Sequence, residues 1–189
     1  MPTAPCLIHC LLCSVCIAVI GTVAVRAQPP APHPAELTAE GAGQLALAGE
    51  ATRSHLLGAV DLYSLALYVG GPMSDRAELA SSALPKALRI VALYKEDLQR
   101  AERLDWQREL VPTLNPDATA HLRRTFASLR HGDAVLIEYS PGRGTTVRVN
   151  KTAAVTDASH DVMLAFLDHW LGQRPVSEEI RRKLLGTAW

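Results

Sequence analysis

The chain has 189 residues, of which 48% are hydrophobic, and its 19 basic and 19 acidic side chains give a formal net charge of zero. Because neither sign of charge is in excess, the composition argues against a nucleic-acid partner. A chain of this length and apolar content suffices for one domain with its own hydrophobic core.

An apolar segment runs from Cys6 to Val25 near the N-terminus, and the sequence Val25-Arg26-Ala27 closes it. Small residues at the −3 and −1 positions of a cleavage after Ala27 are typical of a signal peptide. We therefore interpret residues 1–27 as a signal peptide and expect a periplasmic or secreted protein, without integral membrane association after cleavage. A permanent membrane anchor is the alternative, since about 20 apolar residues can just span a bilayer.

The four cysteines all lie inside this segment, at Cys6, Cys10, Cys13 and Cys16. Cleavage would remove them, so the mature protein is expected to have no disulfide and no cysteine-based metal or redox site. Residues 28–40 begin with the run QPPAPHP, which predicts an extended Pro-rich linker. The folded domain is then predicted to span residues 41–189.

The first half of this domain is expected to be mainly strands. Short apolar segments separated by turn residues fill Gln44–Val69 and predict two or three strands. The run Val60–Val69 alternates only partly between apolar and polar residues, which indicates a central strand buried on both faces. Three further elements are predicted: a short helix capped by Ser74, a strand over Lys86–Tyr94 and a helix over Asp97–Leu110.

The second half begins with a helix behind Asn115-Pro116, in which apolar residues recur at three- and four-residue spacing through Leu129. Its arginines are expected to face water. A β-meander of three strands is predicted next, over Ala134–Tyr139, Thr145–Val149 and Thr152–Thr156.

Two helices are predicted at the C-terminal end. Ser159 opens the first, and Trp170 and Leu171 are expected in the core because Phe166, Leu167 and Trp170 share one face. Gly172 is predicted to end this helix in the left-handed conformation. The last helix begins at Ser177 and stops at Gly186, with acidic residues in its first turn and basic residues near its end.

No motif in the sequence predicts a metal site or a cofactor. HExxH, HxH and GxSxG patterns are all absent, and so is a mature cysteine pair. The segment Gly142–Thr145 contains closely spaced glycines but joins two predicted strands, so we interpret it as a hairpin turn and not as a phosphate loop.

Three segments, in the same order, resemble the chalcone isomerase-like family. Gly49–Val69 is similar to the opening strands of that family, with an arginine ahead of VxLYxxALYV. The sequence YSPGRGTTVRVN (Tyr139–Asn150) resembles its YxPGxGTxVxxN hairpin, and WLGQRPVSEEIRRKLLG (Trp170–Gly186) resembles its C-terminal signature. The resemblance implies an α+β fold, an open-faced β-sandwich in which an antiparallel sheet packs against a layer of helices with a ligand cleft between them.

The resemblance also implies a site. Chalcone isomerases use a cleft arginine, a threonine on the next strand, and a tyrosine and an asparagine further along the chain. Arg53 matches the arginine, whereas Tyr63 occupies the position of the threonine. The later tyrosine and asparagine have no match in this sequence. No catalytic residue is therefore assigned. Fatty-acid-binding relatives of this fold hold a carboxylate with an arginine and a tyrosine from these strands, and Arg53 with Tyr63 fits that pair as the predicted ligand-binding residues.

Physical chemistry supports the same assignment for Arg53. A guanidinium in an apolar cleft stays protonated and favours a carboxylate, which accepts two parallel hydrogen bonds. The alternative is that Arg53 pairs with an internal acid, Asp61 or Glu50, and only supports the fold.

Three functions remain open on the sequence. The leading hypothesis is a periplasmic domain that binds a small amphipathic ligand, a fatty acid or similar carboxylate. The second is an enzyme, an intramolecular lyase of the chalcone isomerase type, in which Arg53 stabilises a developing anion. The third is a structural or partner-binding envelope protein. The sequence does not specify the oligomeric state.

Overall fold

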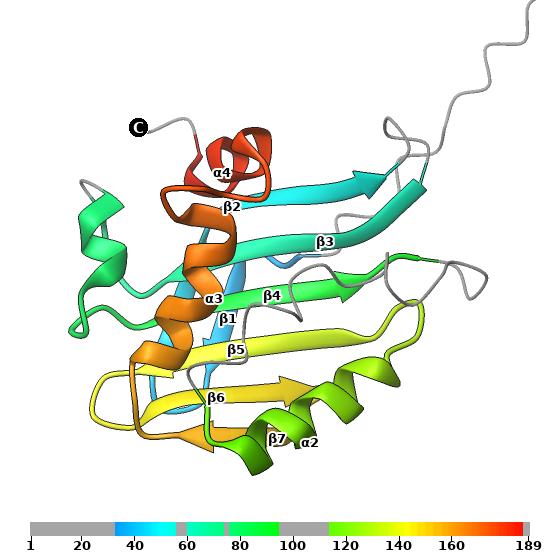
Figure 1. Cartoon of the computed structure of the whole chain (residues 1–189). Coiled ribbons are helices and arrows are strands. Elements are labelled where there is room, and N and C mark those ends of the chain that lie inside the picture. The colour runs from blue at the N-terminus through cyan, green and yellow to red at the C-terminus, as the bar shows by residue number, and fades with distance from the viewer. Residues whose placement is uncertain (1–32, 56–59, 74–75, 95–113, 187–189) are drawn as a thin grey trace, which may run out of the picture. The chain divides into compact units, whose positions relative to one another are not determined.

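Seven strands form one antiparallel sheet in which the order in space is the order in sequence, β1-β2-β3-β4-β5-β6-β7 (Figure 1). This computed structural model describes residues 33–55, 60–73, 76–94 and 114–186. They all belong to one unit of the chain, Ala31–Trp189. The strands are β1 (Glu36–Ala39), β2 (Gly43–His55), β3 (Val60–Val69), β4 (Lys86–Ala92), β5 (Ala134–Ser140), β6 (Gly144–Val149) and β7 (Thr152–Asp157).

The predicted strands are present, and β3 is the central strand that its apolar run indicated. Every residue from Leu62 to Val69 is buried, because β2 and β4 flank this strand and side chains on both of its faces are covered.

One prediction needs correction. Glu36–Ala39, which the prediction placed in the linker 28–40, forms β1 and pairs with the start of β2.

Within the described residues, three α-helices and one short 3-10 helix accompany the sheet: η1 (Arg76–Ala80), α2 (Pro116–Ala127), α3 (Asp161–Leu171) and α4 (Glu178–Leu185). The predicted N-caps Asn115 and Ser177 each accept a hydrogen bond from a backbone N–H of the first turn. Ser74 and the helix predicted over residues 97–110 lie outside the described residues.

The end of α3 differs from the prediction. Gly172 has φ −64° and ψ −172°, so it is extended and not left-handed. Its small size is needed for another reason, since a Cβ atom there would lie 2.3 Å from the carbonyl oxygen of Asp168. The chain therefore turns away from α3 through a close backbone approach, and it reaches Ser177, the N-cap of α4, five residues later.

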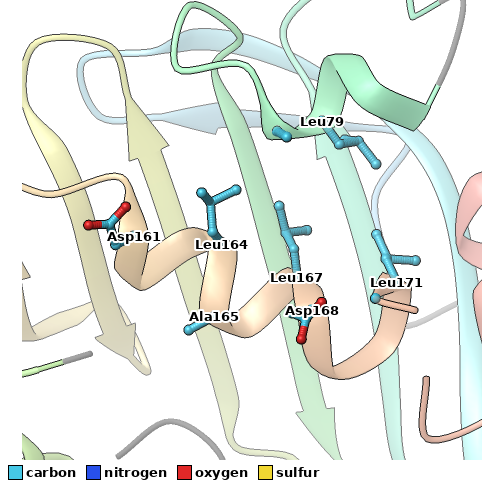
Figure 2. A pocket seen from close by; sticks show the side chains of 9 residues that line it. Leu79, Asp161, Leu164, Ala165, Leu167, Asp168 and Leu171 are labelled. Carbon is cyan, nitrogen blue, oxygen red and sulfur yellow. The ribbon is translucent and has the colours of Figure 1, made fainter. Parts of the chain in front are cut away.

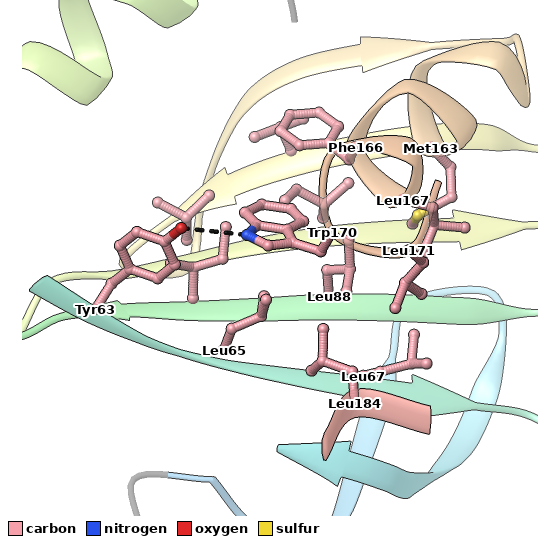
Figure 3. Packing of buried hydrophobic residues seen from close by; sticks show 14 of the residues in the cluster. Tyr63, Leu65, Leu67, Leu88, Met163, Phe166, Leu167, Trp170, Leu171 and Leu184 are labelled. Atoms are coloured by element: carbon pink, nitrogen blue, oxygen red, sulfur yellow. Dashed lines mark hydrogen bonds between the residues drawn. The ribbon is translucent and has the colours of Figure 1, made fainter. Parts of the chain in front are cut away.

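The helices and one face of the sheet enclose the main hydrophobic core. Buried residues of α2, α3 and α4 join those of β3 to β6 in a single cluster. Figure 3 shows Leu65, Leu67 and Leu88 of the sheet facing α3. Trp170 is completely buried and Leu171 is 4% exposed, which confirms the prediction that both belong to the core.

Gly49 allows α4 to pack directly on β2. A Cβ atom at this position would lie 2.3 Å from the backbone oxygen of Lys183 and 2.4 Å from that of Leu184. Only hydrogen fits in this space, so the helix backbone lies against the strand backbone. This close approach places Ile180 and Leu184 in the core.

The opposite face of the sheet, which we call the back face, has a smaller cluster and a polar network. Ala39 and Leu45, from β1 and the start of β2, pack with Ala66, Tyr68 and Ala87. The buried Glu138 accepts a hydrogen bond from Nε of Arg148 at 2.7 Å, and Arg148 also pairs with Glu40. These contacts fasten the β1–β2 hairpin across the back of the sheet.

A second polar group on the back face is centred on His33. Its Nδ1 lies 3.0 Å from Nη1 of Arg89, and its Nε2 lies 3.1 Å from Oγ of Ser64. Because a guanidinium only donates, Nδ1 is the acceptor and Nε2 carries the proton of a neutral imidazole. Burial, and then the positive charge of Arg89, lower the pKa of His33 from 6.5 to about 4.

Replacement of Trp170 with alanine should lower the free energy of unfolding by about 3–5 kcal/mol, because the change leaves a large cavity in the core. Chemical denaturation of wild type and variant measures this loss. Arg123→Ala, which alters an exposed residue of α2, serves as the control. A loss below about 1 kcal/mol for Trp170→Ala would contradict the burial of the indole.

The free energy of unfolding should fall as the pH is lowered from 6.5 to 4. In this interval the unfolded chain binds a proton at His33 and the folded chain does not, so acid favours unfolding. The shift to about 4 corresponds to a loss of roughly 2–3 kcal/mol.

Denaturation at several pH values measures this dependence. His33→Gln should flatten it, because glutamine keeps a donor and an acceptor but does not titrate. His121→Gln, at an exposed position of α2, is the control. If both variants keep the wild-type slope, His33 does not carry the effect.

Candidate functional site

The two residues predicted to bind a ligand lie directly opposite each other. Arg53 of β2 and Tyr63 of β3 are partners in the antiparallel register. Opposed residues project from the same face of a sheet, with Cβ atoms about 5 Å apart. Tyr63 belongs to the core between sheet and helices, so both side chains project from the helix-facing side. The structure therefore brings the predicted pair together.

The two members of the pair differ in exposure. Arg53 is half-buried, whereas Tyr63 has no exposed surface. β2 continues for only two residues beyond Arg53 and has a register irregularity immediately after it. The guanidinium thus stands near one end of the helix-facing side, and the phenol lies further inside.

Trp170 of α3 completes the surroundings of Tyr63. Its Nε1 donates a hydrogen bond to the Tyr63 hydroxyl oxygen over 3.2 Å (Figure 3). The two rings meet edge to face, with centroids 6.4 Å apart and planes at 73°. The ring of His169 contacts Trp170 at 4.9 Å and 87°. Sequence reasoning placed Trp170 in the core but missed its polar contact, because a hydrophobic pattern does not report where an indole N–H points.

Of the two acids proposed as internal partners of Arg53, Glu50 projects away from it. Glu50 is exposed and lies three residues before Arg53 on a regularly paired stretch of β2, so it projects from the opposite face. The carboxylate of Asp61 accepts a hydrogen bond from Oγ of Ser54 at 2.7 Å. The alternative that Glu50 neutralises Arg53 is therefore wrong.

A second cationic group, Lys86, stands at the other end of β3 on the same side of the sheet. Its Nζ donates to the backbone oxygens of Leu79 at 2.8 Å and Ser81 at 2.7 Å, and to Nε2 of His160 at 2.8 Å. Burial lowers the pKa of Lys86 to about 8. Burial and the neighbouring ammonium also lower the pKa of His160.

This arrangement has a structural role. An ammonium has three hydrogens to donate, and three acceptors of the protein receive them. The side chain is completely buried and its Nζ lies 5.0 Å from the centre of the Tyr139 ring. Lys86 therefore connects β4 to η1 and to the start of α3, and it does not present a free amine to a ligand.

The two larger of the hollows found on the described part of the chain lie elsewhere. The first, of 470 Å³, lies between η1 and α3, where Figure 2 shows Leu79 opposite Leu164 and Leu167, with Asp161 and Asp168 on the helix. The second, of 600 Å³, lies on the back face between β1 and β4 to β6, with Arg89, Glu138 and Arg148 among its lining residues. Arg53 and Tyr63 line neither of them.

Within residues 33–55, 60–73, 76–94 and 114–186, no group of three or more histidine, aspartate or glutamate side chains is arranged to hold a metal ion. None of the helices in this part is long and apolar enough to cross a membrane. The chemical groups that the candidate site offers are a guanidinium, a phenol and an indole.

Comparison with known proteins identifies the family and the fold. The family model described as chalcone isomerase-like matches residues 31–186. No curated protein matches the chain significantly. Among solved structures, a fatty-acid binding protein of Arabidopsis thaliana is similar, with a TM-score of 0.55 and 16% sequence identity over 82% of this chain and 92% of that chain.

The similarity to the plant protein shows the fold, a curled antiparallel sheet with helices on one face, as the sequence predicted. The family match covers nearly all the described residues and includes the three segments that carried the resemblance. This chain belongs to the chalcone isomerase-like family.

Proposed function

We propose that this protein binds a small amphipathic carboxylate, a fatty acid or a similar molecule, and that Arg53 and Tyr63 anchor its carboxylate. The observation that carries the proposal is the pairing of a half-buried guanidinium with a buried phenol on the apolar, helix-facing side of the sheet. A solved relative in fold is itself a fatty-acid binding protein.

The two ends of such a ligand would contribute differently to affinity. Hydrogen bonds to a charged group contribute about 1.5–3 kcal/mol net. Each methylene removed from water contributes about 0.8 kcal/mol, so about ten of them contribute roughly 8 kcal/mol before the costs of association. The chain would therefore determine most of the affinity, and Arg53 with Tyr63 would determine orientation and the preference for an acid.

We also propose that residues 1–27 are a signal peptide and that the mature protein is periplasmic or secreted. The support is the apolar segment that ends before a permitted cleavage site at Ala27. A family match that begins at residue 31 is compatible with removal of the preceding segment.

The mature protein should bind decanoic acid more tightly than decan-1-ol, because only the acid supplies an anion for the guanidinium. Arg53→Ala should reduce that difference by about 1.5–3 kcal/mol, while the gain of about 0.8 kcal/mol per methylene across a series of acids persists. Isothermal titration calorimetry measures both quantities.

Arg123→Ala is the matched control, since it removes an exposed arginine of α2 and should leave the acid preference unchanged. Equal affinity of wild type for the acid and the alcohol would contradict the anchor. Turnover of a chalcone-like substrate that Arg53→Ala abolishes would instead identify an intramolecular lyase.

Expression of the full chain in a Gram-negative host should yield a mature protein that starts at or near Gln28. N-terminal sequencing of the protein from the periplasmic fraction checks this expectation, and Ala27→Asp, which blocks the −1 position of the cleavage site, is the control. A retained Met1 with membrane association would show that the apolar segment is an anchor.

A further inference from the structure

We propose that the hollow between η1 and α3 is a docking groove for a partner protein, and that its occupant is a basic amphipathic helix. Two cationic side chains of that helix, seven residues apart, pair with Asp161 and Asp168, and apolar side chains between them fill the hollow. Arg53 and Tyr63 do not line this hollow, so the inference does not depend on the proposed function.

The hollow is mainly apolar and carries two carboxylates. Of its nine lining residues, seven are apolar or glycine, and the other two are Asp161 and Asp168. Leu79 of η1 faces Leu164 of α3 across the hollow (Figure 2). Leu164 and Ala165 are only half-buried, so this part of α3 keeps apolar surface that a partner can cover.

The spacing of the lining residues on α3 matches a second helix. Asp161 and Asp168 are seven residues apart, nearly two full turns, so they share one face and lie about 10 Å apart along the axis. Leu164 and Ala165 lie between them on the same face. A helix packed alongside α3 has the same rise per residue, so its residues i, i+3, i+4 and i+7 meet this pattern position by position.

The charges at the hollow specify the sign of the partner. Asp161 and Asp168 are exposed, and neither carboxylate accepts a hydrogen bond or forms an ion pair within the described part of the chain. No basic residue is among the described residues that line the hollow. Two carboxylates beside apolar surface favour lysine or arginine next to apolar side chains, because complementary charges fix the register of an apolar contact.

The two walls of the hollow are connected before any partner binds. Lys86 donates to the backbone oxygen of Leu79 in η1 and to that of Ser81 just after it. The same ammonium donates to Nε2 of His160, which directly precedes α3. The groove is therefore formed in advance, which lowers the conformational cost of docking.

The test uses an alanine-based helical peptide of about 16 residues, with lysines at i and i+7 and leucines at i+3 and i+4. A mismatched peptide has the same composition but carries its second lysine at i+5, on a different face. Fluorescence anisotropy measures the binding of both to the mature protein. The matched peptide should bind roughly two- to fivefold more tightly, the factor of one exposed ion pair, and salt should reduce this preference.

Asp161→Asn and Asp168→Asn should each weaken binding of the matched peptide roughly two- to fivefold. The two factors should multiply in the double variant, because the positions are too far apart to interact strongly. Asp117→Asn is the matched control, since it removes an exposed carboxylate of α2 that does not line the hollow. It should leave the affinity unchanged.

Methyl NMR locates the bound peptide. Resonances of Leu79 and Leu164, on opposite walls of the hollow, should both shift when the matched peptide is added. The docking groove is overturned if wild type does not prefer the matched peptide, if the double variant keeps that preference, or if these two methyl groups do not respond. Dodecylamine that binds at the same methyl groups as tightly as the peptide would also overturn the helical occupant, in favour of a small cationic amphiphile.

The affinity for decanoic acid separates this inference from the proposed function. The double variant Asp161→Asn with Asp168→Asn should bind decanoic acid as wild type does, because neither residue belongs to the candidate ligand site. A wild type that binds the matched peptide but shows no preference for the acid over decan-1-ol contradicts the proposed function alone. A parallel loss of acid binding and peptide binding in the double variant would show that the hollow is not a separate surface, and would overturn the inference.

Discussion

The contact between Trp170 and Tyr63 joins the helical layer to the centre of the sheet. The two residues are 107 positions apart in sequence, and each has no exposed surface. Around them, Leu65, Leu67 and Leu88 pack against α3 (Figure 3). The hydrogen bond between the indole and the phenol oxygen lowers the cost of burying the two polar groups, since an unpaired polar group in this core would destabilise the fold. One contact thus connects the core to the candidate site.

Two positively charged residues on the helix-facing side of the sheet, Lys86 and Arg53, have different surroundings. Lys86 is fully buried, and two backbone carbonyls together with His160 accept its three hydrogens. Arg53, at the opposite end, keeps accessible surface beside an apolar core. This contrast distinguishes a fully buried cation that supports the fold from a half-buried one at the candidate site. It also explains why we assign no binding role to Lys86, despite its lowered pKa.

The back face of the sheet is stabilised by a different kind of interaction. The β1–β2 hairpin packs Ala39 and Leu45 in a small apolar cluster. It is also held by Arg148, which pairs with both Glu138 and Glu40, and the chain just before it is held by the neutral His33 between Ser64 and Arg89. The main core depends on burial, whereas the attachment of this hairpin depends in addition on charge and on protonation. The two faces are expected to respond differently to acid, because protonation of the His33 imidazole, whose pKa is lowered by burial and Arg89, acts on the back face.

The amino-acid sequence by itself determined the class of fold and the order of the elements. Apolar periodicity predicted β3, the meander β5 to β7 and the helices α2 to α4, because these patterns depend on local spacing. The motifs that resemble the family led to Arg53 and Tyr63. Local signals failed at Glu36–Ala39, because these four residues directly follow a Pro-rich run and become a strand only when β2 supplies hydrogen-bond partners. They also failed at Gly172. Glycine is required there because a side chain would collide with the carbonyl oxygen of Asp168, and not because the backbone is left-handed.

Only the tertiary structure decided which side chains meet. The register of β2 on β3 places Arg53 opposite Tyr63, and the packing of α3 brings the Trp170 indole to the Tyr63 oxygen. The neutral state of His33 and the hydrogen bonds of the Lys86 ammonium likewise depend on groups from several distant elements. Hydrogen bonds and pKa values are set by distances of a few ångströms and by burial. Hydrophobic spacing along a chain does not encode these quantities, so they become fixed only when strands and helices pack together.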